Sequence, residues 1–222
     1  MQRFFDILLS SVALLVLLPL FVPLALILRF TGEGKVFYLQ ERVGMGRRVF
    51  KVIKFATMLE NSPHIGTGTV TVKDDPRVLP VGRFLRKSKL NELPQLLNIL
   101  NGDMSVIGPR PQAKREFATL PIEAQNAITQ IRPGLSGVGS IIFRDEESII
   151  QNQKNPVHFH DYVIAPYKVK LEGWYIANQG LVTYFKLILL TIWVVIFPKS
   201  RSVWNLLPAL PLPPSELATV LQ

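Results

Sequence analysis

Apolar residues are concentrated in two long segments, one near each end of the chain. The first runs from residue 7 to residue 28 without a charged side chain and lies between Arg3 and Arg29. A helix of that length can cross a bilayer core of about 30 Å. Pro19 and Pro23 remove two backbone donors near its middle, so a kink or a break is expected there. Hydropathy leaves two hypotheses open: a straight span, or a helix broken at Pro19 that returns to the same membrane face.

The second apolar segment, Leu181–Phe197, contains only three polar interruptions, at Thr183, Lys186 and Thr191. Its shorter length and its internal lysine favour a helix that lies at a membrane interface or packs against the protein. The remaining residues, 198–222, contain five prolines and are expected to form a loosely ordered tail.

Between these segments the pattern predicts short elements of both kinds. Val49–Phe55 alternates apolar and basic residues, which predicts a strand or hairpin with the glycines at 44 and 46 near its turn. Asn61–Thr71 is polar and aperiodic, which indicates a mobile loop. Val81–Lys87 and Glu116–Gln130 are expected to form helices.

The central stretch is expected to be a helix from Leu90 to about Asn101. Leucines recur at 90, 93, 97 and 100 and would form its buried face. Asn91 has the side chain of an N-cap, and Gly102 suits the residue that ends the helix. Glu92 would then lie at the helix N-terminus, where free backbone N–H groups and the helix dipole favour anions such as phosphate.

The net charge of the chain indicates which kinds of molecule it binds. The formal net charge is +9, and residues 73–115 alone contribute +5. Such a balance favours phosphates, nucleic acid or an acidic membrane surface as partners. The basic residues lack interleaved aromatics and an apolar anchor has no role on nucleic acid, so no nucleic acid partner is expected. The chain has no cysteine, which excludes a disulfide framework and a thiolate nucleophile.

Two arginines are held in stiff loops by neighbouring prolines. Arg110 lies between Pro109 and Pro111, and Arg132 precedes Pro133. A residue before proline is restricted to extended conformations, so each guanidinium is presented from a rigid backbone. Rigid presentation suits bidentate binding of a phosphate group.

Six segments in this order resemble the bacterial sugar transferase family, which comprises monotopic polyprenyl-phosphate glycosyl-1-phosphate transferases. They are Gln40–Gly44, Lys54–Met58, Asp75–Arg77 with Val81–Arg86, Asn91–Leu96, Gly102–Ser105 with Gly108–Pro111, and Arg132–Gly134. The resemblance implies transfer of sugar-1-phosphate from a UDP-sugar to polyprenyl (undecaprenyl) phosphate, with release of UMP. This step would initiate the synthesis of a surface polysaccharide or glycoconjugate.

The resemblance also implies an architecture. It is an α/β, mostly helical protein embedded in the bacterial inner membrane, with its catalytic domain facing the cytoplasm and membrane lipid as a partner. Residues 1–34 would form a re-entrant helix broken near Pro19, and residues 35–180 the catalytic domain. Residues 181–197 would form an interfacial helix and 198–222 a proline-rich tail. A homodimer is left open.

The site residues that the resemblance implies differ from the family pattern at one position. The implied catalytic residues are Asn91, Glu92 and Lys54, the substrate-binding residues are Arg83, Arg86, Arg110 and Arg132, and Glu92 would hold Mg²⁺. The family's catalytic pair is Asp-Glu, in which the Asp attacks the sugar-side phosphate, whereas this chain has Asn91-Glu92.

An amide is not a nucleophile at neutral pH, so three hypotheses remain for this pair. Glu92 could act as nucleophile, or as base for direct attack by polyprenyl phosphate, or activity could be lost. Because Lys54, Arg110 and Arg132 are retained, an active enzyme is favoured. The alternative is a non-catalytic membrane subunit that binds nucleotide sugar or prenyl phosphate.

Overall fold

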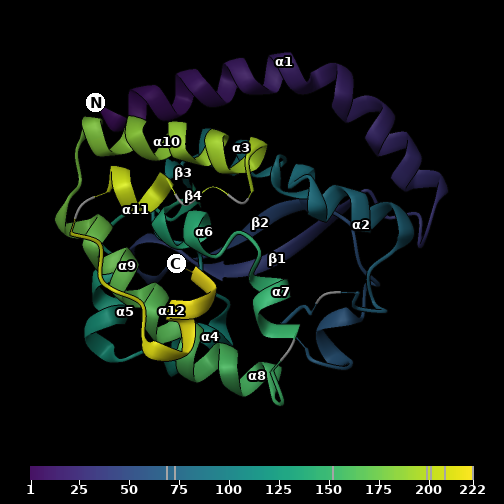
Figure 1. Ribbon diagram of the computed structural model, residues 1–222. Coiled ribbons are helices and arrows are strands. Elements are labelled where there is room, and N and C mark those ends of the chain that lie inside the picture. Colours follow the sequence, from purple (N-terminus) through teal and green to yellow (C-terminus); the bar gives the residue numbers. More distant parts are fainter. Residues whose placement is uncertain are drawn as a thin grey trace.

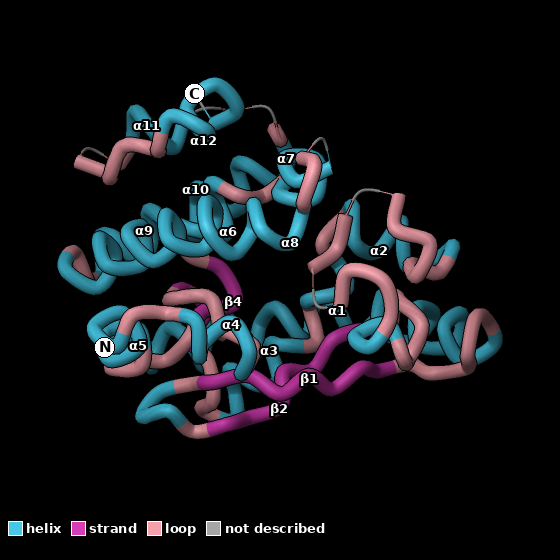
Figure 2. Tube along the Cα trace, turned by 90° about the horizontal axis from the view of Figure 1, so that it is seen from below, coloured by secondary structure: helices cyan, strands magenta, loops and turns pink. Residues whose placement is uncertain are grey.

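The computed structural model shows a mostly helical molecule with two small sheets, as the sequence predicts. It describes residues 1–68, 70–72, 74–151, 153–198, 200, 202–207 and 209–221, excepting the side chains of residues 219 and 220. Helix α1 (Gln2–Phe30) arches over one side of the body, with α10 (Leu181–Ile196) beside its first half (Figure 1). The view from below in Figure 2 shows the β1–β2 hairpin on one side, the C-terminal helices on the other, and α6, α9 and α10 between them.

Helix α1 continues through Pro19 and Pro23, so the predicted break near Pro19 is absent, and the helix is curved rather than straight (Figure 1). Within the described residues it is the one helix long and apolar enough to cross a membrane. Its first turns are held to the body by Asp6, whose carboxylate accepts hydrogen bonds from Ser105 Oγ at 2.8 Å and Tyr184 OH at 2.9 Å. A buried carboxylate is tolerated here because hydrogen-bond donors surround it.

The other end of α1 also contacts the body. Leu24 and Leu28 are buried in a cluster with Phe55 and Leu85. Both ends of the helix therefore lie against the same globular part, and between them Ala13, Leu14 and Leu17 also pack on it.

The predicted hairpin is confirmed. Strands β1 (Phe37–Val43) and β2 (Val49–Phe55) pair antiparallel, with Tyr38 opposite Lys54. The turn between them, η1 (Met45–Arg47), includes a glycine at a positive φ of 64°, which a residue without a Cβ adopts readily.

The central helix begins later than expected. The short helix α2 (Pro80–Lys87) leads into a 3₁₀ turn, η3 (Leu90–Glu92), and α3 runs only over Gln95–Asn101. Asn91 is therefore inside a 3₁₀ turn and does not cap a helix, so that prediction is wrong. Pro94 is the N-cap residue of α3, and the predicted stop at Gly102 is confirmed by its φ of 91°.

The buried face of α3 also differs from the predicted face of leucines at 90, 93, 97 and 100. Leu97 is 39% exposed, whereas Leu96, Ile99 and the polar Asn98 are buried. Asn98 accepts a hydrogen bond from the backbone of Ile53 at 2.9 Å and donates one to Lys51 O at 2.8 Å. The hairpin thus binds α3 through a polar side chain, which an apolar periodicity does not reveal.

A second, parallel pair of strands lies beneath α1. Strands β3 (Ser105–Ile107) and β4 (Gly134–Ser136) are joined through two helices, α4 (Lys114–Thr119) and α5 (Ile122–Ile128). The expected single helix over 116–130 is therefore two helices, because Leu120, which precedes a proline, is extended.

The C-terminal half is helical and contains the largest apolar core. Its elements are α6 (Val138–Ile142), α7 (Glu146–Gln151), α8 (Pro156–Phe159), the π-helical turn η4 (His160–Ile164), α9 (Ala165–Ala177), α10, α11 (Ser202–Leu206) and α12 (Ser215–Leu221).

The expectation of a loosely ordered tail is wrong for its described residues. Leu207 and Leu217 are buried in the main core, and Tyr167 OH donates to Pro211 O at 2.7 Å. Apolar side chains spaced between the prolines supply this packing. Residues 199, 201, 208 and 222 of the tail lie outside the described residues.

The loop predicted at Asn61–Thr71 contains one 3₁₀ turn, η2 (Ser62–His64). It is wrapped around the buried guanidinium of Arg77, which donates to Ser62 O at 2.8 Å and pairs with Asp75 at 2.6 Å. Thr69 lies outside the described residues.

Candidate active site

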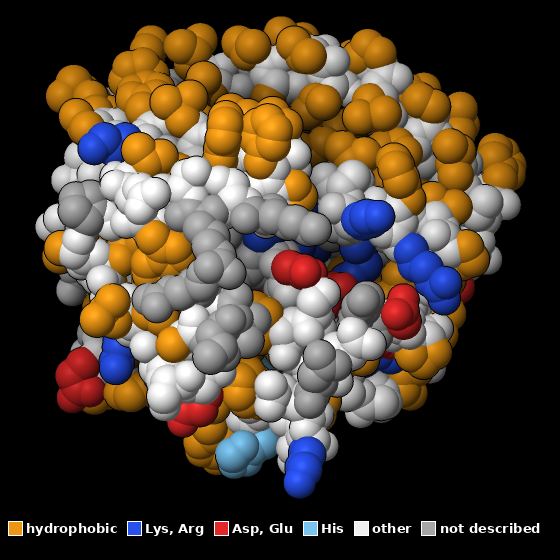
Figure 3. All heavy atoms as spheres, in the orientation of Figure 1, with side chains coloured by type: hydrophobic (Ala, Val, Ile, Leu, Met, Phe, Trp, Pro, Cys, Tyr) orange, Lys and Arg blue, Asp and Glu red, His pale blue; other side chains and the backbone are white. Residues whose placement is uncertain are grey.

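A small pocket lies where the hairpin, the η3 turn and the two parallel strands meet. Its wall is formed by Arg42, Val52, Lys54, Glu92, Gln95, Arg110, Pro111, Gly134 and Leu135. Figure 3 shows Lys, Arg, Asp and Glu side chains gathered at the centre of this face, below an apolar band over α1 and α10. Val52 belongs to the apolar cluster against which Leu14 and Leu17 of α1 pack, so one wall of the pocket is continuous with the contact between α1 and the body.

The pocket is centred on an ion pair between strand and turn. Lys54 Nζ lies 3.0 Å from Glu92 Oε1, and both side chains are largely buried. Residue 54 is presented by β2, and Glu92 follows Lys89, whose φ of 60° turns the chain into η3. Arg110 contributes a second cation, with its Nη2 3.9 Å from the same carboxylate oxygen. The structure therefore brings together three residues that the sequence singled out.

The charges of this group are strongly coupled. Burial lowers the pKa of Lys54 to about 8, although Glu92 opposes the shift. Burial would raise the pKa of Glu92, but Lys54 and Arg110 together hold it well below its usual range. At neutral pH the site therefore contains a carboxylate and two cations, which leaves a surplus of positive charge for an anionic ligand.

Behind the pocket, Glu172 supports the loop that carries Arg110. Glu172 is on α9 and is 3% exposed. Burial raises its pKa to about 7, and the backbone N–H groups of Arg110 and Gly139 partly oppose the shift. This carboxyl therefore lies against the backbone of the Pro109–Pro111 loop.

Arg42 and Gln95 line the pocket but were not among the predicted site residues. Arg42 donates to Glu116 Oε2 at 3.2 Å and to Gln40 Oε1 at 2.8 Å. The alternation of side chains along β1 could have identified Arg42 from the sequence. Tyr38 pairs with Lys54, so positions 38, 40 and 42 lie on the same face of the hairpin as position 54.

Four other predicted residues do not line the pocket. Asn91 is 6% exposed. Arg83 is exposed on α2, and Arg86 forms an ion pair with Glu147 of α7. Arg132 donates its Nε–H to Gly102 O at 2.8 Å, so it holds two loops together.

The residues present fit Mg²⁺ that is held mainly through substrate phosphates. Among the described residues no group of three His, Asp or Glu side chains could hold a metal ion. Mg²⁺ commonly binds through one or two carboxylates together with substrate phosphates and water. Glu92 supplies one carboxylate, and the buried Oδ1 of the adjacent Asn91 has no hydrogen-bond partner within the described part of the chain.

Comparison with known proteins agrees with the resemblance seen in the sequence. Residues 1–198 match the family described as "Bacterial sugar transferase". The chain is 40% identical over 161 residues to the exopolysaccharide production protein ExoY of Rhizobium meliloti (strain 1021), which covers 66% of this chain and 71% of that protein. It is 36% identical over 172 residues to ExoY of Sinorhizobium fredii, covering 71% of this chain and 76% of that protein.

A longer relative is similar over more of the chain. The chain is 33% identical over 192 residues to the UDP-glucose:undecaprenyl-phosphate glucose-1-phosphate transferase of Escherichia coli (strain K12). That match covers 84% of this chain and 40% of the relative. The family match extends through α10 and includes every residue that lines the pocket. The chain therefore belongs to the bacterial sugar transferase family.

Proposed function

We propose that the protein transfers sugar-1-phosphate from a UDP-sugar to undecaprenyl phosphate and releases UMP, which initiates synthesis of a surface polysaccharide or glycoconjugate. The observation that carries this proposal is the cationic pocket around Glu92, in a chain that belongs to this family. Relatives at 33% and 38% identity are named undecaprenyl-phosphate transferases of glucose-1-phosphate and N-acetylgalactosamine phosphate.

The pocket chemistry suits phosphoryl transfer. Such reactions depend mainly on positioning the phosphates and neutralising their charge. Lys54 and Arg110 would bind the diphosphate oxygens, and the ion pair with Glu92 keeps the ammonium of Lys54 aimed at the pocket. Glu92 would hold Mg²⁺, which when bound neutralises further negative charge on the diphosphate.

We also propose that α1 is a re-entrant membrane anchor and that α10 lies at the interface of the bacterial inner membrane. The two helices expose contiguous apolar side chains, which include Leu15 and Val16 on α1 and Val182 and Leu189 on α10 (Figure 3). Both ends of α1 contact the same globular part, which supports a helix that enters and leaves on the cytoplasmic face. The pocket under α1 would then meet a lipid-borne phosphate at the membrane surface.

The test is UMP release by the full chain in detergent with Mg²⁺ and undecaprenyl phosphate. The donors are UDP-glucose, UDP-galactose, UDP-N-acetylglucosamine and UDP-N-acetylgalactosamine. Wild type is compared with Glu92→Gln, with Asn91→Asp, and with Glu123→Gln, a matched control on the exposed surface of α5.

We expect turnover by wild type and Glu123→Gln, and loss of turnover in Glu92→Gln. A silent wild type with activity gained in Asn91→Asp would contradict the proposal for the natural chain and assign the loss to one side chain. UDP-sugar binding without UMP release from either protein would favour the non-catalytic binding subunit.

A further inference from the structure

The wall of the pocket offers few groups that could attack phosphorus. Of the residues that line it within the described chain, only Glu92 and Lys54 carry a side-chain atom capable of forming a covalent intermediate. The ammonium of Lys54 donates a hydrogen bond to Glu92 Oε1 at 3.0 Å and has no free lone pair with which to attack.

Glu92 is a poor nucleophile in this environment. Its Oε1 already accepts a hydrogen bond from Lys54 and lies 3.9 Å from Arg110. Both cations stabilise the negative charge on this oxygen and so make it less reactive as a nucleophile. Nucleophilicity falls as basicity falls. A phosphate monoester, with a second pKa of about 6, is more basic than this carboxylate and carries its own charge to the reaction.

Asn91 adds no nucleophile to the site. Its side chain is buried and does not line the pocket, and an amide is neutral. Position 91 therefore contributes no negative charge that would repel an incoming anion. Because Arg42 is paired with Glu116 at 3.2 Å, the wall leaves Lys54 and Arg110 against the single carboxylate of Glu92, a surplus of positive charge that favours anionic substrates.

We propose that this chain catalyses transfer by a single displacement, in which undecaprenyl phosphate attacks the UDP-sugar directly while both are bound. An oxygen of the acceptor phosphate forms a bond to the sugar-side phosphorus. The bond from that phosphorus to the bridging oxygen breaks, and the bridging oxygen leaves with UMP and the electron pair. No proton is transferred and no bond to the protein forms. The inference rests on the proposed function and specifies how its reaction proceeds.

The experiment is isotope exchange with the full wild-type chain, delipidated in detergent with Mg²⁺. The protein is incubated with radiolabelled UMP and the UDP-sugar that supports transfer, without undecaprenyl phosphate. A single displacement predicts no label in the UDP-sugar. Addition of undecaprenyl phosphate to the same sample should start exchange, because the complete reaction then runs in both directions, and this serves as the positive control. Intact-mass measurement after incubation with UDP-sugar alone should show no phosphosugar adduct.

Each outcome decides between the alternatives. Exchange without acceptor at the rate of transfer, or an adduct on the protein, would overturn the single displacement while leaving the proposed function in place. Transfer with acceptor-dependent exchange alone supports it. Failure of wild type to transfer any of the four sugars would already appear in the UMP-release assay and would overturn both proposals.

Discussion

Lys54 makes the chemistry of the pocket sensitive to pH. Burial lowers its pKa to about 8, so it loses its positive charge in a range where an exposed lysine stays charged. If this charge binds the diphosphate, kcat/KM should fall about tenfold per pH unit above pH 8. The measurement is the pH profile of UMP release for wild type and Lys54→Arg.

Lys54→Arg keeps a cation with a pKa above 12, so its activity should be lower but its alkaline decline should disappear. Lys54→Ala should be slower by about 100-fold or more below pH 8, and this difference should narrow at higher pH as wild type loses the charge of Lys54. An alkaline decline that survives in Lys54→Arg would have to come from a group other than Lys54.

Glu172 should make the free energy of unfolding depend on pH between about 4.5 and 7, below the range in which Lys54 loses its charge. Its pKa is raised to about 7 by burial, so the folded protein retains a proton that the unfolded chain releases near pH 4.5. Stability from this group is full below that pH and is lost as the pH rises to about 7, by up to about 3 kcal/mol.

Glu172→Gln cannot ionise and should lack this loss. The thermal midpoint of wild type should therefore fall relative to that of Glu172→Gln between pH 5 and pH 8. Glu123→Gln on the surface of α5 controls for removal of a charge. Parallel curves for wild type and Glu172→Gln would mean that Glu172 is ionised throughout.

The pocket could be predicted from sequence only in part. Lys54, Glu92 and Arg110 belong to short motifs whose chemistry is visible in the residue types, and the structure places them together. Arg132 looks equivalent to Arg110 in sequence, since a proline follows each. Its guanidinium nevertheless binds a backbone carbonyl, because the direction of a side chain depends on contacts formed by distant segments.

At the scale of elements, the predictions from local pattern depend on what each element packs against. The hairpin could be predicted because its two signals, the alternation of apolar and basic residues and the glycines of the turn, lie within the segment itself. The buried face of α3 could not, since its Asn98 satisfies the backbone of β2. The tail helices α11 and α12 were missed because prolines obscured leucines that pack on the main core.

The position of α2 depends on a close approach to the loop after β2. A Cβ at Gly82 would lie 2.1 Å from Thr57 O, so any side chain there must displace the helix. Because α2 leads into η3, this displacement would also move Glu92. Gly82→Ala should lower the stability by roughly 1–3 kcal/mol and reduce UMP release.

Gly173→Ala is the matched control. Gly173 lies inside α9, and a Cβ there would have nothing within 4 Å. Alanine is favoured over glycine in a helix interior by about 1 kcal/mol, so the thermal midpoint should be unchanged or higher. Equal midpoints for Gly82→Ala and Gly173→Ala would show that α2 shifts at little cost.

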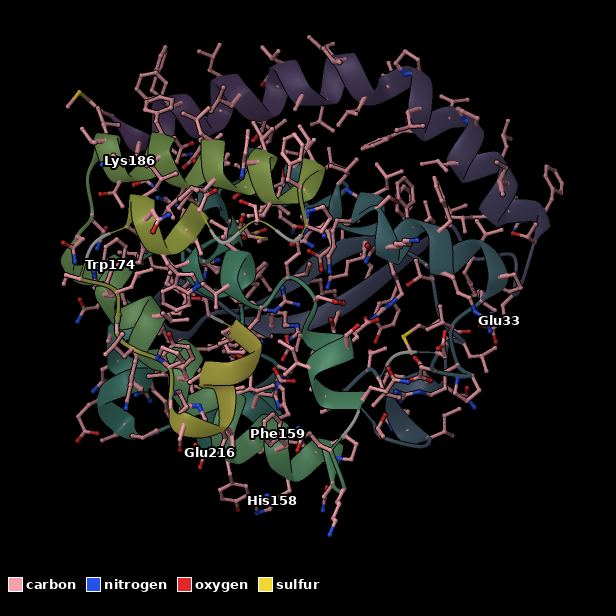
Figure 4. The ribbon with its side chains drawn as sticks, in the orientation of Figure 1. Glu33, His158, Phe159, Trp174, Lys186 and Glu216 are labelled. Carbon is pink, nitrogen blue, oxygen red and sulfur yellow. The ribbon has the colours of Figure 1, made fainter. Side chains whose placement is uncertain are left out.

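At the scale of the whole molecule, exposed apolar side chains gather on the side of α1 and α10, and charged side chains such as Glu216 lie on the opposite side. Figure 4 shows Lys186 on α10 beside the first half of α1, and Glu33 beyond the far end of α1. His158 and Glu216 lie on the opposite side of the body, away from the apolar band. A large exposed apolar surface on one side is typical of a membrane contact.

The arrangement of α1 predicts that both of its ends face the cytoplasm. The chain has no cysteine, so single cysteines can be introduced without background: one ahead of Met1, one as Glu33→Cys, and one as Lys114→Cys in the globular part. A membrane-impermeant maleimide should label none of them in intact spheroplasts and all of them in inverted vesicles.

A spanning helix would instead expose one end of α1 in spheroplasts while Lys114→Cys stayed protected. That result would require α1 to give up its contacts at one end, either the hydrogen bonds of Asp6 with Ser105 and Tyr184 or the burial of Leu28. Breaking the first set would leave the buried hydroxyls of Ser105 and Tyr184 without their acceptor, at a cost of about 1–3 kcal/mol each. The polar contacts of Asp6 therefore favour the re-entrant arrangement over the straight span that hydropathy alone allows.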